Sequence, residues 1–217
     1  MYLFPVLALP LGFVLLYMSA YPEEERPTCR REVLRGLVLS PLVWILSGLV
    51  GSLMPDFPGS PLLILSDWAD RSLPLAGLPL LGYALFHRLD ERMPAGAAER
   101  RMAAFFAGSL MPIGVAEAAR SWASPDLYLV VLLPVLTASM ALVVGPAASG
   151  IAYEYGWRRA PRILALVLAT MAAAAPRWLL LSGLWPLALL LTALIAFLSW
   201  LYAGQGLTRR QAAPAAA

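Results

Sequence analysis

The stretch from Met102 to Trp122 is apolar for most of its length, yet it carries Pro112 in its middle and Glu117 near its end. At a rise of about 1.5 Å per residue, a helix over this stretch matches the roughly 30 Å hydrocarbon core of a bilayer. A charged side chain at the bilayer centre costs about 2.5 to 3.5 kcal/mol. The stretch therefore predicts a membrane-spanning helix whose Glu117 faces other helices, water or a partner charge.

The composition of the whole chain fits this prediction. The 217 residues are 60% hydrophobic and 13% charged, with a mean hydropathy of +0.73, whereas a typical soluble domain has about 25% charged residues. A water-soluble globular domain is excluded by this balance.

Similar apolar runs recur along the chain and predict an all-α, polytopic membrane bundle of about seven transmembrane helices. The predicted spans are Met1–Tyr21, Gly36–Met54, Pro74–Phe86, Met102–Trp122, Leu127–Tyr153, Ile163–Leu181 and Trp185–Ala203. Residues 1–204 form one transmembrane domain in this interpretation, and residues 205–217 form a cytoplasmic tail that we expect to be disordered.

The distribution of arginine predicts the orientation of the bundle. With seven spans and the amino terminus outside, thirteen of the sixteen arginines fall in the inner segments. The three on the outer side are Arg71, Arg120 and Arg177. Because cytoplasmic segments carry an excess of basic residues, this split favours an outer amino terminus and an inner carboxyl terminus.

Residues 56–72 interrupt the pattern, because the apolar part of this segment is too short to cross a bilayer. One interpretation places it in the membrane interface, with Leu62 and Trp68 toward lipid and Asp67 and Asp70 toward water. The other interpretation is a re-entrant segment, and the sequence leaves both open.

Glu117, Arg120 and Arg177 are the candidate site residues. Arg120 lies three positions after Glu117, on the same helical face. Arg177 stands as far beyond Arg162 as Glu117 stands beyond Met102, and both helices are predicted to run outward, so the two opposite charges should lie at a similar depth. Such a pair is either a structural lock or the binding region for a polar solute.

Four further positions are predicted to break the helices: Pro112, Pro176, Gly145 and Pro146. A proline removes a backbone hydrogen bond, and the freed carbonyl is tolerated at membrane depth where other helices or water satisfy it. Interrupted helices of this kind form the solute sites of many transporters.

Several kinds of chemistry are excluded or disfavoured. The chain contains no lysine, which excludes a lysine Schiff base. A single histidine, His87, and a single cysteine, Cys29, cannot build a metal or haem centre with several such ligands. No nucleophile with a nearby base is apparent, so no catalytic residue, metal or cofactor is predicted.

The function that we predict is transport or permeation of a small polar solute or ion. The alternative is a non-catalytic subunit or scaffold of a larger membrane complex. The expected partners are membrane lipids, together with a partner membrane protein or further copies of the chain, and not nucleic acid. The abundance of alanine and arginine without lysine points to the cytoplasmic membrane of a prokaryote.

Overall fold

The computed structural model describes residue 23 and residues 26–53, 60, 62–87, 95–120, 127–153 and 159–211, and most of these residues are helical. The first predicted span, Met1–Tyr21, lies outside the described residues, as do residues 212–217 of the predicted tail.

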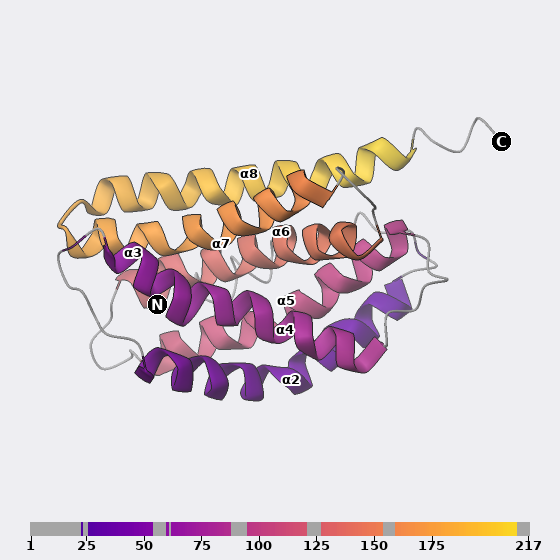
Figure 1. Ribbon diagram of the computed structural model, residues 1–217, viewed down its shortest axis with the longest axis horizontal. Helices are drawn as coiled ribbons and strands as arrows, with labels where there is room; N and C mark the ends of the chain where they lie inside the picture. The colour runs from indigo at the N-terminus through magenta and orange to yellow at the C-terminus, as the bar shows by residue number, and fades with distance from the viewer. Residues whose placement is uncertain are drawn as a thin grey trace.

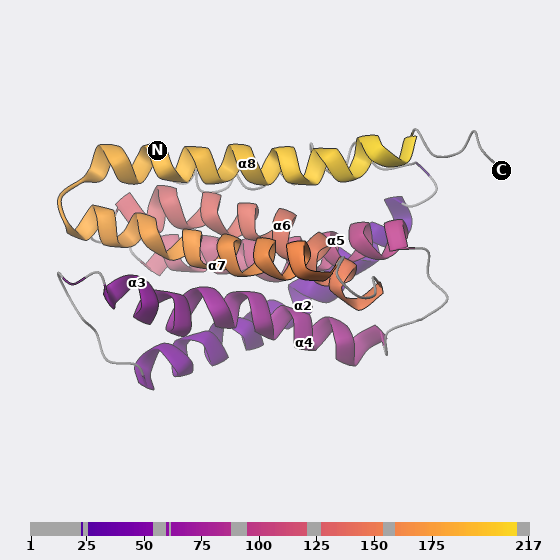
Figure 2. The ribbon, with the colours of Figure 1, turned by 45° about the horizontal axis from the view of Figure 1, so that its top comes forward.

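Six helical rods lie side by side in the described part of the chain (Figures 1 and 2). In chain order, the elements are α2 (Arg26–Leu53), α3 (Leu62–Asp67), η2 (Trp68–Ser72), α4 (Leu73–His87), α5 (Ala95–Arg120), η3 (Tyr128–Leu132), α6 (Leu133–Tyr153), α7 (Arg159–Leu181) and α8 (Trp185–Gln211). Here η marks a π-helical turn. The predicted all-α class is confirmed.

The rods define two ends of the bundle. We call the end where α2 stops at Leu53 and α7 turns into α8 the turn end, which lies at the left in Figure 1. The opposite end, where α2 begins and α4 stops at His87, is the arginine end.

Within the described residues, four helical segments are long and apolar enough to cross a membrane: Arg26–Leu53, Tyr128–Ser149, Arg159–Leu181 and Trp185–Ala203. The structure thus contains candidate membrane helices as expected, whereas the count of seven spans and their orientation stay predictions.

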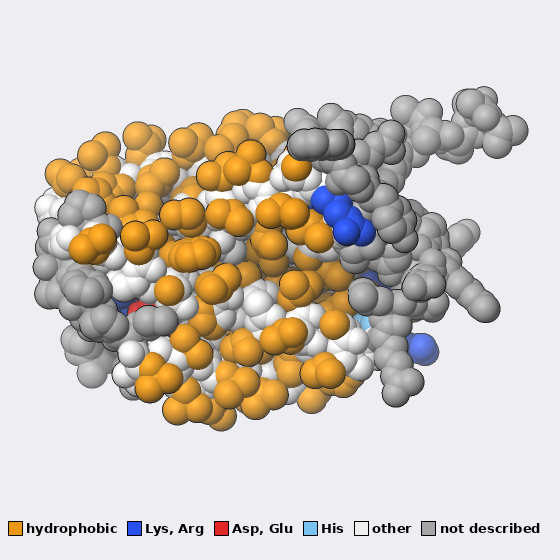
Figure 3. All heavy atoms as spheres, viewed as in Figure 1, with side chains coloured by type: hydrophobic (Ala, Val, Ile, Leu, Met, Phe, Trp, Pro, Cys, Tyr) orange, Lys and Arg blue, Asp and Glu red, His pale blue; other side chains and the backbone are white. Residues whose placement is uncertain are grey.

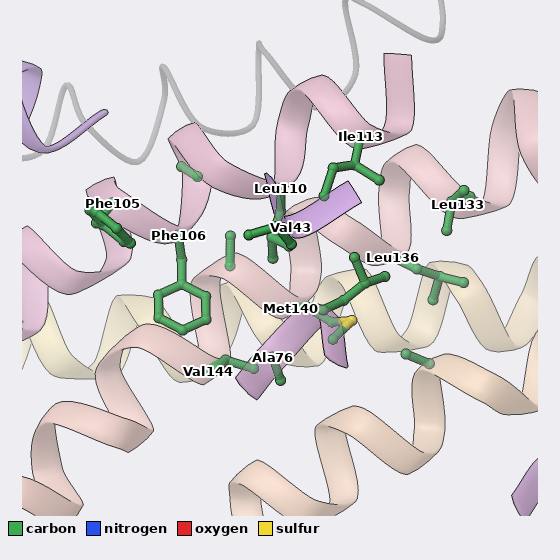
Figure 4. Packing of buried hydrophobic residues seen from close by; sticks show 14 of the residues in the cluster. Val43, Ala76, Phe105, Phe106, Leu110, Ile113, Leu133, Leu136, Met140 and Val144 are labelled. Carbon is green, nitrogen blue, oxygen red and sulfur yellow. The ribbon is translucent and has the colours of Figure 1, made fainter. Parts of the chain in front are cut away.

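The core of the bundle is formed by α5 and α6. Every residue from Met102 to Leu110 is buried, and 83% of the apolar window of α6 is buried, against 17% for α2 and 22% for α7 and α8. The buried side chains include Phe105, Phe106 and Leu110 of α5 together with Leu136, Met140 and Val144 of α6 (Figure 4). The remaining helices surround this pair.

The outward faces of α2, α7 and α8 are strongly apolar. Large exposed side chains include Val38 and Leu53 on α2, Leu168 on α7, and Leu190 and Phe197 on α8. In the view of Figure 3, apolar side chains cover the middle of the molecule, and charged side chains appear only toward its two ends. Such a belt is expected of a surface in contact with lipid, since a soluble monomer rarely exposes so large an apolar area.

Small residues allow the helices to approach closely. A Cβ atom at Gly36 would lie 2.2 Å from the carbonyl oxygen of Phe105, and one at Gly108 would lie 2.1 Å from the carbonyl oxygen of Val33. Glycines therefore fix the crossing of α2 and α5, as is common in membrane helix pairs.

The predicted helix breaks do not occur, because α5 continues through Pro112, α6 through Pro146 and α7 through Pro176. Neighbouring helices support the backbone at such positions. Gly145 has a packing role instead, since its Cβ would lie 2.8 Å from the Cα of Ala103 on α5.

Over its described residues, the segment predicted as interfacial or re-entrant is helical and continues directly into the next helix. Leu62 to His87 forms one uninterrupted rod in which α3 passes through η2 into α4. The N–H of Leu73 donates to the carbonyl of Trp68, five residues earlier, which makes η2 a π-helical turn. The prediction that Asp67 and Asp70 face water is wrong, because both are buried.

The connection between α7 and α8 is a tight turn at Gly183, whose φ is 76°. The N–H of Leu184 donates to the carbonyl of Leu179, and the N–H of Gly183 donates to that of Leu180. These two bonds make a Schellman motif, for which glycine is preferred at the left-handed position.

Candidate functional site

A cavity of about 450 Å³ lies among the helices in the half of the bundle nearer the turn end. Its wall is formed by residues of α2, η2, α4, α5, η3, α6 and α7, so nearly every rod contributes to it. The volume falls in the range of about 300 to 1,000 Å³ that is typical of small-molecule sites.

Both π-helical turns of the described chain border this cavity. Asp70, Arg71 and Ser72 come from η2, and Tyr128 comes from η3. A π-helical turn shifts the facing of the residues that follow it, and such turns are frequent at functional sites. The irregular backbone therefore coincides with the polar part of the wall.

Glu117, the residue singled out in the sequence, lines the cavity from α5. Its Oε1 atom accepts a hydrogen bond of 2.6 Å from the indole N–H of Trp44 on α2. A hydrogen bond to a carboxylate is shorter and stronger than one between neutral groups. The second oxygen, Oε2, accepts no hydrogen bond from the described residues.

Arg177 has a different partner from the one predicted. Its guanidinium forms an ion pair and a hydrogen bond with Oδ1 of Asp67, whose side chain is buried. Arg71 lies 3.7 Å from the same oxygen. The predicted pair between Glu117 and Arg177 is not found. Instead, α3 and η2 pack against α7 and place Asp67 beside Arg177.

Ser47 is a polar residue of the wall without a partner in the described residues. It lies one helical turn beyond Trp44, and its Oγ atom is buried without a hydrogen bond. A buried hydroxyl that makes no hydrogen bond costs free energy unless a ligand or water satisfies it. By contrast, Thr137 donates its wall hydroxyl to the carbonyl of Pro134.

The rest of the wall is apolar and includes Leu75, Ile113, Leu136 and Met140. Within the described ranges, no group of three or more His, Cys, Asp or Glu side chains is placed to hold a metal ion. The cavity thus combines a few polar groups with an apolar floor, which is the usual make-up of a small-molecule site.

A second buried charged cluster lies at the arginine end. Glu32 on α2 is 1% exposed. Its Oε1 atom accepts a hydrogen bond of 2.7 Å from Arg35, and its Oε2 atom lies 2.8 Å from Nε2 of His87 at the end of α4. This cluster connects α2 to α4 at the end of the bundle that lies away from the cavity.

Another polar cluster at the arginine end joins three helices. Arg162 on α7 lies 3.5 Å from Glu99 on α5 and donates a hydrogen bond of 2.7 Å to the hydroxyl of Tyr202 on α8. This contact holds α7 between the core and the outermost helix.

Of the candidate residues from the sequence, Glu117 lies in the cavity wall. Arg177 is not in the wall but pairs with Asp67, which also lies close to the wall residue Arg71. Arg120 ends α5, and its side chain lies outside the described residues. The predicted break positions, Pro112, Pro176, Gly145 and Pro146, are not in the cavity wall.

Sequence reasoning missed Trp44, Ser47, Asp70 and Tyr128 as wall residues. Only one of them carried a usable signal: Trp44 is the one tryptophan that lies well inside a predicted span rather than near its boundary. No protein-family model, no curated protein and no solved structure matched the chain.

Proposed function

We propose that this protein binds a small polar solute or ion in the cavity and conducts it across the membrane. The observation that carries the proposal is the Glu117 carboxylate, which lies in the wall of a ligand-sized cavity within an apolar helical bundle. Ionisable residues among membrane helices are costly and typically mark solute paths.

The arrangement of the wall supports this proposal. Small residues on one face of α2 leave space in the cavity, since a Cβ at Gly48 would meet no atom within 4 Å and one at Gly51 would meet only the carbonyl oxygen of Asp70, at 4.0 Å. Phe106 and Val144, which lie in the core nearer the arginine end, are fully buried. We infer that the cavity opens toward the turn end, where Gly51, Glu117 and Tyr128 line it, and that inward passage requires the helices to move.

We place the turn end on the outer side of a prokaryotic cytoplasmic membrane. This placement rests on the arginine distribution in the sequence, because most arginines belong to the opposite end. In this orientation the cavity receives its solute from outside the cell.

The proposal is tested by flux into proteoliposomes made with the purified protein. Uptake of radiolabelled glycerol, glycine, ethanolamine and potassium is followed in separate experiments, with a chloride ionophore in the liposomes so that the charge of an entering cation is balanced. Gly48→Leu places a side chain in the cavity and should abolish flux of the conducted solute while leaving the fold intact, because nothing obstructs its Cβ. Glu117→Gln should also abolish flux.

Gly77→Leu is the matched control, since its Cβ likewise meets nothing within 4 Å and Gly77 is not in the cavity wall. Flux that survives Gly48→Leu would rule out the cavity as the path. If no solute passes and native mass spectrometry reveals a second polypeptide in fixed ratio, the alternative function of a non-catalytic subunit is supported instead.

A further inference from the structure

The polar groups of the cavity wall restrict the chemistry of its ligand. Among the described residues, the carboxylate of Glu117 accepts its hydrogen bond from the neutral indole of Trp44, whereas Arg71 and Arg177 lie against Asp67. A carboxylate in an environment of low polarity favours a cation as its neighbour, so the wall favours a positively charged ligand.

The hydrogen-bonding groups point to a donor on the ligand. The Oε2 atom of Glu117 accepts no hydrogen bond from the described residues, and the Oγ atom of Ser47 is buried without a partner. Trp44 and Ser47 lie three residues apart on one face of α2, so Ser47 is a neighbour of the Trp44–Glu117 pair. A ligand N–H group could donate to both oxygens.

The apolar floor excludes a bare metal ion as the best ligand. Alkali and alkaline-earth ions require six or more oxygen ligands or retained water, whereas much of this wall consists of aliphatic side chains such as Ile113, Leu136 and Met140. An organic ligand would place its carbon skeleton against these side chains. The indole ring of Trp44 adds an aromatic surface that attracts cations.

We propose that the solute is a small organic cation, specifically a protonated amine, whose ammonium group is bound by Glu117 and Ser47 and whose carbon skeleton packs on the floor formed by Ile113, Leu136 and Met140. This inference deepens the proposed function and rests on its premise that the cavity binds a solute.

The test is a binding measurement on the full-length protein in lipid nanodiscs with three probes that share a cyclohexyl ring and one further carbon: cyclohexylmethylammonium, cyclohexylmethanol and cyclohexanecarboxylate. The ammonium probe should bind about tenfold or more tightly than the alcohol, because the alcohol cannot form a charge-assisted hydrogen bond with Glu117. The carboxylate probe should bind most weakly, because its negative charge is repelled by Glu117. Gly48→Leu should abolish binding of the ammonium probe.

Variants assign the binding to the named groups. Glu117→Gln should weaken binding of the ammonium probe about tenfold or more and leave binding of the alcohol nearly unchanged. Ser47→Ala should weaken binding of the ammonium probe by a smaller factor. This variant supplies an independent test if the Glu117 variant fails to fold. Glu23→Gln is the control, since Glu23 is an exposed carboxylate that lies outside the cavity wall.

Equal binding of the alcohol and the ammonium probe, or unchanged ammonium binding in both Glu117→Gln and Ser47→Ala, would overturn the inference. This outcome leaves the proposed function standing if Gly48→Leu still blocks flux of another solute. Ammonium binding that depends on Glu117 without flux of any amine into liposomes would support the ligand class and overturn the proposed transport.

Discussion

The indole N–H of Trp44 on α2 donates a hydrogen bond of 2.6 Å to the carboxylate of Glu117 on α5. The two residues are 73 positions apart in the chain. They lie at a similar height in the bundle because Gly36 and Gly108, within the same two helices, fix the crossing of α2 and α5. The position of the Glu117 carboxylate in the cavity wall thus depends on packing that is established about two helical turns away.

Trp44→Phe removes the donor and keeps an aromatic ring. We expect it to lower stability by about 1.5 to 3 kcal/mol at most, the range for hydrogen bonds to charged groups, with less lost where water reaches the carboxylate. The check is the midpoint of thermal unfolding in detergent. Trp185→Phe is the control because Trp185 is 57% exposed, and an equal shift in both variants would contradict the prediction.

Asp67→Asn should be strongly destabilising, because it leaves Arg177 without its counter-charge in a buried site. Breaking a buried pair by removing one partner typically costs about 3 to 5 kcal/mol. Arg71→Ala should have a much smaller effect, since Arg71 lies 3.7 Å from Asp67 and its side chain is 43% exposed. Thermal unfolding of both variants provides the comparison, and similar losses would show that Arg177 is not the main partner.

Glu32→Gln should loosen the contact between α2 and α4 at the arginine end. The amide retains one acceptor but loses the negative charge that faces Arg35 and His87. The expected loss is on the order of 1 to 3 kcal/mol, because the buried site penalises an incompletely satisfied polar group. Hydrogen exchange of α4 should increase more in this variant than in Glu23→Gln, whose side chain is exposed.

Gly108→Ala should disrupt the crossing of α2 and α5. Its Cβ would lie 2.1 Å from the carbonyl oxygen of Val33, so the backbones must separate. Overpacking of this kind typically costs about 1 to 3 kcal/mol or more. Gly77→Ala should instead be neutral or stabilising, because its Cβ meets no atom within 4 Å and alanine favours helix. Equal thermal midpoints for the two variants would argue against a tight crossing.

Much of the fold follows from hydrophobic runs. The predicted spans Ile163–Leu181 and Trp185–Ala203 coincide closely with α7 and the apolar part of α8, because lipid-facing helices need uninterrupted apolar residues. The prediction failed for Asp67 and Asp70, which were expected to face water and are buried. Length and polarity alone did not reveal that Asp67 would find Arg177 more than a hundred positions later.

The candidate site was predictable only in part. The cost of a carboxylate in an apolar helix identified Glu117 without any structural information. Its partner could not be identified, because several charged and polar residues share the same depth, and the choice among them depends on how the helices rotate about their axes. Glu32 was not among the candidate residues from the sequence, yet the position of α4 places His87 against it and buries it.

The rod from Leu62 to His87 gives the molecule a direct connection between its two ends. It carries Asp70 and Arg71 in the cavity wall near one end, and His87 beside Glu32 at the other. One continuous helical rod therefore contacts both the cavity wall and the Glu32 cluster. If a bound ligand displaces η2 along the axis of the rod, we expect the distance between His87 and Glu32 to change with it.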